Sequence, residues 1–311
     1  MRIAVIGAGG VGGPFGSALA RAGNDVTFLA RGAHLEAMRR DGLRVEGALG
    51  NFHLSPTQAT DDAAEIGPVD IVLFTVKLWD VETAGAKLKP LIGPETAVVT
   101  LQNGVDAPDR LAKVLGPEAV MGGVAIINAA IAGPGRITQM GEYQSLTFGE
   151  MDGRITPRGE ALLAACRAAG VNARLSDDIV KDLWEKFVFL VSVSALTAAS
   201  RQRMAYIRTD PDARATLARL LAEVTAVGRA SGVALADDLP EQRLAMIDGQ
   251  NGESIASMAI DLLRGNRLEL PWLAGKAVEI GRAHGVETPA LQALTGILRP
   301  FEMGAPELPK V

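Results

Sequence analysis

Cysteine, basic charge and long apolar runs are scarce in this chain, and each shortage excludes a class of protein. Cys166 is the one cysteine among 311 residues, so no internal disulfide can form, which fits a reducing cytoplasm. Acidic residues exceed basic ones by 36 to 31, which argues against nucleic acid as a general partner. The best candidate for a membrane helix, residues 187–199, is shorter than the roughly 20 residues that a bilayer requires. We expect a cytoplasmic protein without membrane association, and no signal peptide, because a strand pattern begins at residue 2.

Strand-like and helix-like segments alternate in the first half of the sequence. Apolar segments of strand character occupy residues 3–6, 26–30, 69–76, 97–101, 119–127 and 145–148. From about residue 177 the pattern changes, and helical periodicity fills residues 178–199, 210–231, 241–247, 251–264 and 271–284. The alternation predicts a parallel sheet covered by helices on both faces. We therefore expect an α/β fold with a Rossmann-type parallel-sheet domain, residues 1–176, followed by an all-helical domain, residues 177–311.

Glycines cluster between the first expected strand and the first expected helix. Gly7, Gly9 and Gly12 form the pattern G-x-G-x-x-G, with Gly10 inside it. In a strand–turn–helix context, the first glycine permits a tight turn, the second lets backbone amides approach a pyrophosphate, and the third allows close packing. The helix N-terminus then faces the anion with unbonded N–H groups. The motif predicts a dinucleotide site, whereas a glycine-rich turn without a ligand is the alternative.

The residue that ends the second strand indicates which dinucleotide is bound. Sites that prefer NAD usually place an acidic residue there to bind the ribose 2′-hydroxyl, but this chain has Arg31. A guanidinium would bind a 2′-phosphate, and Lys77, after the strand at 69–76, could add a second positive charge. We therefore expect NADP, although an arginine or lysine at a strand end is often only an exposed surface residue.

Hydride transfer to a carbonyl leaves an alkoxide, so a neighbouring group must supply a proton. The three histidines do not suggest this role: His34 follows Arg31 and would lie near the adenosine end of the cofactor, His53 lies in a polar stretch, and His284 precedes Gly285 at an expected helix end. Lys186 is the best-placed lysine, because it opens a long apolar helix between aromatic residues. Judged from the residues alone, a structural role for Lys186 is more common than a catalytic one: a lysine at the end of a buried helix extends its amine into water.

The chain resembles the ketopantoate reductases (2-dehydropantoate 2-reductases) over nearly its whole length. The matching segments are IAVIGAGGVGG, LAR at Arg31, TVKLWD at Lys77, LQNGVD at Asn103, GGVAIINAAIAGPGRI, LWEKF at Lys186, SMAIDLLRGNRLEL and AHGVETP. The last four discriminate better than the glycine motif. The resemblance implies NADPH-dependent reduction of ketopantoate to pantoate, a step of pantothenate biosynthesis.

The resemblance also implies roles for matching positions. Lys186 matches the lysine that donates a proton to the ketone oxygen, and Glu269 matches the glutamate that binds substrate and assists it. Ser257 matches a serine that binds the substrate carboxylate, and Asn103 an asparagine near nicotinamide and substrate. Arg31 and Lys77 match the pair that holds the 2′-phosphate. Glu269 could instead act only as a helix N-terminal residue, and it could also contact the cofactor. No metal is implied.

Three positions depart from the family pattern. The family has asparagines four and eight residues after its lysine, where this chain has Leu190 and Ser194, and Ser254 stands in place of a third asparagine. Leucine cannot hydrogen-bond a substrate hydroxyl. We therefore expect that the proton donor is retained but the substrate pocket is altered. A more apolar 2-oxo acid is the alternative substrate.

Two other functions stay open. A β-hydroxyacid or sugar-acid dehydrogenase would share the two-domain plan, but LQNGVDAPDR replaces the glycine-rich substrate loop of those enzymes. A nucleotide-sensing binding module without catalysis is the non-enzymatic alternative, because such folds also host non-enzymes. The apolar helical half could supply the interface of a homodimer.

Overall fold

The computed structural model describes residues 1–249 and 252–306. It divides into two compact units, Met1–Asp182 and Leu183–Val311. The domain boundary expected after residue 176 stays a prediction; the division between the units falls six residues later, inside the first turns of a helix.

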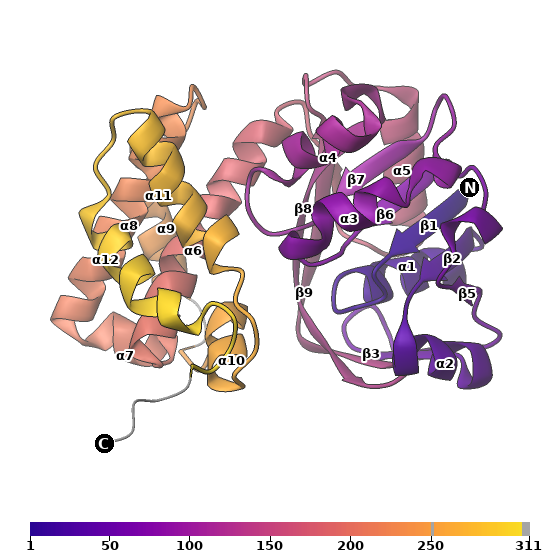
Figure 1. The fold of residues 1–311 in the computed structure, drawn as a ribbon, viewed down its shortest axis with the longest axis horizontal. Coiled ribbons are helices and arrows are strands. Elements are labelled where there is room, and N and C mark those ends of the chain that lie inside the picture. The colour runs from indigo at the N-terminus through magenta and orange to yellow at the C-terminus, as the bar shows by residue number, and fades with distance from the viewer. Residues whose placement is uncertain (250–251, 307–311) are drawn as a thin grey trace. The chain divides into compact units, whose positions relative to one another are not determined.

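One ten-stranded sheet forms the centre of the first unit, in the order β4-β3-β9-β8-β7-β6-β1-β2-β5, with β10 paired to β9 (Figure 1). The strands are β1 (Arg2–Ile6), β2 (Asp25–Leu29), β3 (Leu43–Glu46), β4 (Phe52–Leu54), β5 (Ala59–Thr60), β6 (Ile71–Phe74), β7 (Ala97–Thr100), β8 (Val120–Gly133), β9 (Arg136–Glu150) and β10 (Ala173–Leu175). β1, β2, β6 and β7 pair in parallel, so their carboxyl ends meet at one edge. This confirms the predicted Rossmann-type arrangement.

The sheet also contains antiparallel pairs that the sequence pattern did not predict. β8 and β9 form a long antiparallel hairpin, and β3 pairs antiparallel with β4. The expected strands at 119–127 and 145–148 are therefore parts of much longer strands. Only two residues join β8 to β9, and Gly135 has a φ of +68°, a conformation that glycine adopts readily. A connection this short permits only an antiparallel pairing.

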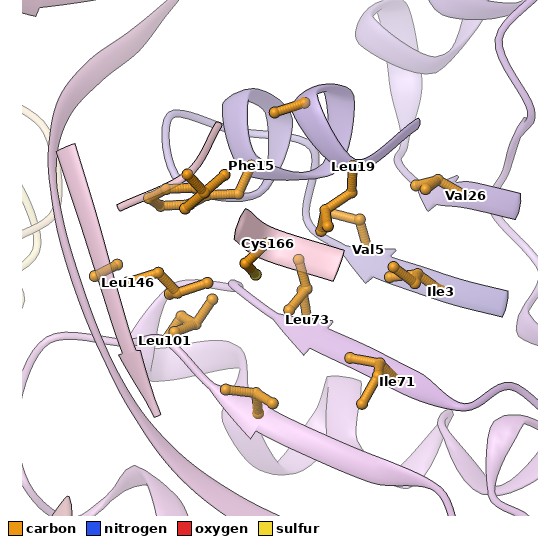
Figure 2. Close-up of a cluster of buried hydrophobic side chains, with 14 of the residues drawn as sticks. Ile3, Val5, Phe15, Leu19, Val26, Ile71, Leu73, Leu101, Leu146 and Cys166 are labelled. Carbon is orange, nitrogen blue, oxygen red and sulfur yellow. The ribbon is translucent and has the colours of Figure 1, made fainter. Parts of the chain in front are cut away.

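Helices and sheet of the first unit enclose an apolar core. The α-helices are α1 (Gly12–Arg21), α2 (Gly32–Asp41), α3 (Val81–Ala86), α4 (Ala107–Leu115) and α5 (Pro157–Ala168). Figure 2 shows Phe15 and Leu19 of α1 pointing toward Val5 of β1, Leu73 of β6 and Cys166 of α5. Burial of these side chains fixes α1 against β1, and thereby the position of the glycine-rich turn between them.

In the residues that the structure describes, the second unit is built from helices. They are α6 (Ile179–Ser200), α7 (Met204–Thr209), α8 (Pro211–Ala230), α9 (Leu239–Asp248), α10 (Ser257–Leu263), α11 (Ala274–Ala283) and α12 (Pro289–Leu298). Short 3₁₀ helices are η1 (Ala63–Glu65), η2 (Leu78–Asp80), η3 (Lys89–Leu91) and η4 (Pro117–Ala119) in the first unit, and η5 (Leu270–Trp272) and η6 (Arg299–Phe301) in the second. The all-helical prediction is confirmed for these residues. The helix expected at 251–264 begins only at Ser257, and residues 250–251 lie outside the described part.

The first helix of this unit is long and apolar. By length and composition α6 could cross a membrane, but 67% of its most apolar window is buried inside the protein, as in a core helix. Trp184 and Phe187 are buried, and their rings meet edge to face with centroids 5.4 Å apart. α8 passes close to Trp184: a Cβ added to Gly228 of α8 would lie 2.8 Å from the indole ring. This packing fixes the helix that carries Lys186.

Candidate active site

Gly7 and Gly12 are required by the packing of the turn after β1. Gly7 has a φ of +99°, and an added Cβ would lie 3.1 Å from the Thr75 carbonyl oxygen. A Cβ on Gly12, at the start of α1, would lie 2.3 Å from the Gly7 carbonyl oxygen. These contacts let helix and strand approach each other, as the motif predicts.

Gly9 differs from its neighbours, because a Cβ added there would meet no atom of the described part of the chain within 4 Å. The fold itself therefore does not require glycine at this position. The N-terminus of α1 has no side-chain cap and no acidic residue in its first turn. Open space above bare backbone, at the positive end of a helix, fits a bound pyrophosphate.

Gly10 and Gly13 contact the hairpin. A Cβ on Gly10 would lie 2.0 Å from the Ala129 carbonyl oxygen of β8, and one on Gly13 would lie 2.0 Å from Ile137 Cδ1 of β9. Packing against the hairpin thus accounts for the absence of a side chain at Gly10. Its expected part in cofactor binding stays a prediction.

Arg31 and Lys77 follow β2 and β6 at the edge where the parallel strands end. The Arg31 guanidinium donates from Nη2 to Asp80 Oδ2 of η2 at 3.0 Å, and its side chain is 86% exposed. Lys77 is exposed, with Nζ 5.6 Å from the centroid of the Trp79 ring. The two cations therefore lie on loops that the Arg31–Asp80 ion pair joins.

Asn103 follows β7 at the same edge and is partly buried. The neighbouring Gln102 donates from Nε2 to the carbonyl oxygens of Phe74 at 2.9 Å and Val76 at 3.2 Å. These bonds tie the end of β7 to the end of β6, and they hold the loop that carries Asn103.

In the second unit, Lys186 and Glu269 interact electrostatically. Lys186 is a partly buried residue of α6, and Glu269 is buried immediately before η5. Burial lowers the pKa of the Lys186 ammonium from 10.5 to about 8, and the Glu269 carboxylate opposes this by favouring the charged form. The result is an amine that holds a proton near neutral pH and can also release it.

Leu190 and Ser194 follow Lys186 at four-residue intervals, and therefore lie on the same face of α6. Three other hydroxyls of this helix, those of Ser192, Thr197 and Ser200, donate to carbonyl oxygens four residues earlier. Ser194 is 1% exposed, and among the described residues its hydroxyl has no hydrogen-bond partner. A buried hydroxyl without a partner costs about 1–3 kcal/mol, a cost that a polar ligand group could offset.

Ser254 and Ser257 are exposed, and Ser257 is the first residue of α10. The Ser254 carbonyl oxygen accepts a hydrogen bond from the Met204 amide at 3.0 Å, which links this segment to α7. The binding roles expected of both serines stay predictions.

Thr75 and His34 also shape the glycine-rich turn, although the sequence alone did not predict that they contact it. The Thr75 hydroxyl donates to the Gly7 carbonyl oxygen at 2.6 Å. The His34 ring, in α2, bonds through Nε2 to the Ala8 carbonyl oxygen at 2.9 Å, and its Nδ1 accepts from the Gly135 amide at 3.0 Å. No sequence motif marks these contacts, because they join segments up to 101 residues apart.

Family models of known proteins match both units. The model described as "Ketopantoate reductase PanE/ApbA" matches residues 3–153, and its C-terminal counterpart matches residues 178–302. A 2-dehydropantoate 2-reductase of Mesorhizobium japonicum is 31% identical over 96% of this chain and 97% of its own length.

Solved structures agree with this match. A 2-dehydropantoate 2-reductase from Geobacter metallireducens superposes with a TM-score of 0.89 at 33% identity, and covers 96% of this chain and 99% of its own. D-mandelate dehydrogenase shares the fold, with a TM-score of 0.87 over 97% of this chain and 98% of its own, at 23% identity. Sequence and structure together place this chain in the ketopantoate reductase family of oxidoreductases.

Proposed function

We propose that this protein is an NADPH-dependent reductase of a 2-oxo acid, of the type that converts ketopantoate to pantoate. The observation that carries the proposal is the Lys186–Glu269 pair, in which burial brings the lysine pKa to about 8. The relatives named 2-dehydropantoate 2-reductase support the same reaction class.

Lys186 is the proton donor in this proposal. Reduced nicotinamide, when bound, supplies the hydride that C2 of the 2-oxo acid receives. Lys186 Nζ gives its proton to the ketone oxygen as negative charge develops there, so the product is a 2-hydroxy acid and the amine is left neutral. Glu269 favours the protonated amine and would also bind the substrate hydroxyl or the cofactor. Ser257 would bind the substrate carboxylate, and Asn103 would orient the carbonyl.

The cofactor would bind at the carboxyl edge of the sheet in the first unit. Gly9 leaves room for the pyrophosphate, Gly7 and Gly12 shape the turn, and Gly10 continues the bare backbone. Arg31 would bind the 2′-phosphate with Lys77 as a second cation, which supports NADPH over NADH. Cytoplasmic location fits the single cysteine.

Replacement of the proposed donor tests this function. Purified protein should oxidise NADPH in the presence of ketopantoate or another branched 2-oxo acid. Lys186→Ala should lower kcat by about 10²–10⁴-fold, because general acid catalysis is lost, while the Kd for NADPH stays unchanged. Lys181→Ala, five residues earlier on α6, is the matched control and should keep full activity. Full activity of Lys186→Ala would disprove the mechanism, and NADPH binding without turnover by the wild type would favour a binding module.

Leu190 favours a second candidate substrate, a 2-oxo acid with an apolar side chain. A leucine one turn from Lys186 offers methyl groups where a substrate hydroxyl would need a partner. A panel of 2-oxo acids with apolar and hydroxylated side chains, assayed with both reduced cofactors, separates the two candidates. Leu190→Asn should shift the kcat/KM ratio toward ketopantoate by about tenfold or more. An unchanged ratio would remove Leu190 from the pocket.

A further inference from the structure

A single imidazole joins three segments around the glycine-rich turn. His34 lies in α2, its Nε2 is 2.9 Å from the Ala8 carbonyl oxygen, and its Nδ1 accepts from the Gly135 amide at 3.0 Å. Ala8 lies inside the glycine motif, and Gly135 lies in the turn of the β8–β9 hairpin. α2 follows the strand end at Arg31, so this one side chain connects the turn, the hairpin and the helix after Arg31.

The two contacts define the protonation state of the ring. Nδ1 accepts a hydrogen bond, so the remaining proton is on Nε2, which donates it to Ala8. A charged imidazole would carry a proton on Nδ1 as well and could not accept from Gly135. Burial lowers the pKa of His34, and the bond to the Ala8 carbonyl only partly opposes this, which favours the neutral ring.

The bond to Ala8 also sets the direction of the next amide. In a trans peptide the carbonyl and the following N–H point in opposite directions within one plane. A carbonyl of Ala8 that is held toward His34 therefore directs the Gly9 N–H away from α2. Thr75 holds the preceding carbonyl, that of Gly7, in the same manner at 2.6 Å. Side chains thus bind two successive carbonyl oxygens of the turn. These oxygens therefore do not face the open side of Gly9, where they would repel a bound anion.

We propose that His34 is a positioning residue for the cofactor, which orients the Ala8–Gly9 peptide so that the turn binds a pyrophosphate. The proposal rests on the proposed NADPH function and adds a residue to it. His34 touches neither substrate nor the reacting atoms; it acts through the backbone of the turn. The contact to Gly135 holds the ring in place, and the contact to Ala8 performs the function.

Two conservative replacements separate these contacts. The Gln side-chain nitrogen lies as many bonds from Cβ as His Nε2 does, so His34→Gln keeps the donor to Ala8. The Asn side-chain oxygen lies as many bonds from Cβ as His Nδ1, so His34→Asn keeps the acceptor for Gly135. His34→Ala removes both. His53→Ala is the matched control, because His53 bonds through Nε2 to the carbonyl oxygen of Asp41, at the far end of α2, and not to the glycine-rich turn.

NADPH fluorescence titration gives the dissociation constants, and thermal unfolding shows which variants are folded. His34→Ala and His34→Asn should raise the Kd for NADPH about tenfold, whereas His34→Gln should stay within about threefold of the wild type. In the nucleotide-free protein, hydrogen exchange at residues 7–12 should accelerate in His34→Ala and be restored in His34→Gln. His53→Ala should change neither quantity.

Several outcomes would overturn the proposal. An unchanged Kd in folded His34→Ala would show that the ring does not act on the turn. Rescue by Asn rather than Gln would assign the effect to the hairpin contact alone. A lowered unfolding temperature without a changed Kd would show a purely structural role. If the wild type bound neither NADPH nor NADH, the proposed function would fail first and this inference with it.

Discussion

At the scale of single residues, the ammonium of Lys186 is the proposed proton donor. Its pKa, about 8, lies where a proton donor must be charged at physiological pH yet able to release the proton. Reduction should therefore be fastest below pH 8 and fall as the pH rises through 8, because the donor is then deprotonated. The pH dependence of kcat with saturating NADPH measures this. A rate that stays constant up to pH 10 would contradict the assignment.

Glu269 is expected to move that pH dependence. Its carboxylate favours the charged amine, so Glu269→Gln should lower the pKa of Lys186 further and shift the falling limb of the kcat profile to lower pH. Each pKa unit corresponds to about 1.4 kcal/mol, or about a tenfold change in the protonated fraction above the pKa. Glu279→Gln serves as a control, since Glu279 pairs with Lys276 on α11 at 2.8 Å. A profile that loses amplitude without shifting would leave Glu269 a role in substrate binding alone.

Arg31 offers a test of cofactor choice. Arg31→Ala should reduce the preference for NADPH over NADH by about 10- to 100-fold, because charged hydrogen bonds of roughly 1.5–3 kcal/mol to the 2′-phosphate are lost. Arg154→Ala is a suitable control: this arginine is also exposed and pairs with a carboxylate, Asp152, at 2.6 Å. The ratio of kcat/KM values for the two cofactors is the measurement. An unchanged ratio would remove Arg31 from the cofactor site.

At the scale of elements, the glycine motif contains residues that packing requires and one, Gly9, for which we predict a role in cofactor binding alone. Gly9→Ala places its methyl in open space, so the unfolding temperature should stay the same while the Kd for NADPH rises about tenfold or more. Gly10→Ala places its methyl 2.0 Å from a backbone oxygen of β8 and should destabilise the protein by about 2 kcal/mol or more. Equal thermal effects of the two replacements would contradict this division.

A buried carboxylate joins two helices of the second unit. Glu223 of α8 accepts from the amides of Ala290 and Leu291, at 3.1 and 3.0 Å, at the N-terminus of α12. Glu223→Ala should lower the free energy of unfolding by about 2–3 kcal/mol, because two amides lose a charged acceptor. Arg219→Ala removes only an exposed partner of the same carboxylate and should cost less than about 1 kcal/mol. Urea unfolding provides both values, and similar losses would show that the cap contributes little.

Element types were predictable where local chemistry determines them, and pairings were not. Apolar runs such as residues 69–76 and 97–101 predicted strands, and the structure has β6 and β7 there. The hairpin extends from residue 120 to 150, but apolar side chains of its distal part, such as those of Ile131, Met140 and Tyr143, are exposed. Burial therefore does not impose the apolar pattern of a core strand on this part of the sequence. α12 was not predicted, although Glu223 caps it, because a cap from another helix leaves no local signal.

At the scale of the whole molecule, the single cysteine makes unfolding of one unit observable. Cys166 is fully buried in the core of the first unit, and burial raises the pKa of its thiol to about 12. The native protein should therefore not react with a thiol reagent over hours at pH 8, and urea should release one reactive thiol. Saturating NADPH should slow the reaction further, since a ligand that binds only the folded unit stabilises it. Rapid labelling of the native protein would show that this core opens readily.

The site was predictable from the sequence only in part. The resemblance pointed to Lys186 and Glu269, which interact electrostatically in the structure, and their catalytic roles stay predictions. Thr75 and Asp80 were not assigned to the cofactor site, and His34 was expected near the adenosine end only because it follows Arg31; the contacts of all three join distant segments. A sequence motif shows which residues a turn needs. It does not show which side chains of distant elements bind the carbonyl oxygens of that turn.

The contact between Gly10 and β8 has a consequence for evolution within the family. A methyl group at residue 10 cannot coexist with the Ala129 carbonyl at its present position. Position 10 and the length of the hairpin are therefore constrained together. Homologues with a larger side chain there should have a shortened or displaced hairpin, and transplanting such a hairpin should make Gly10→Ala harmless.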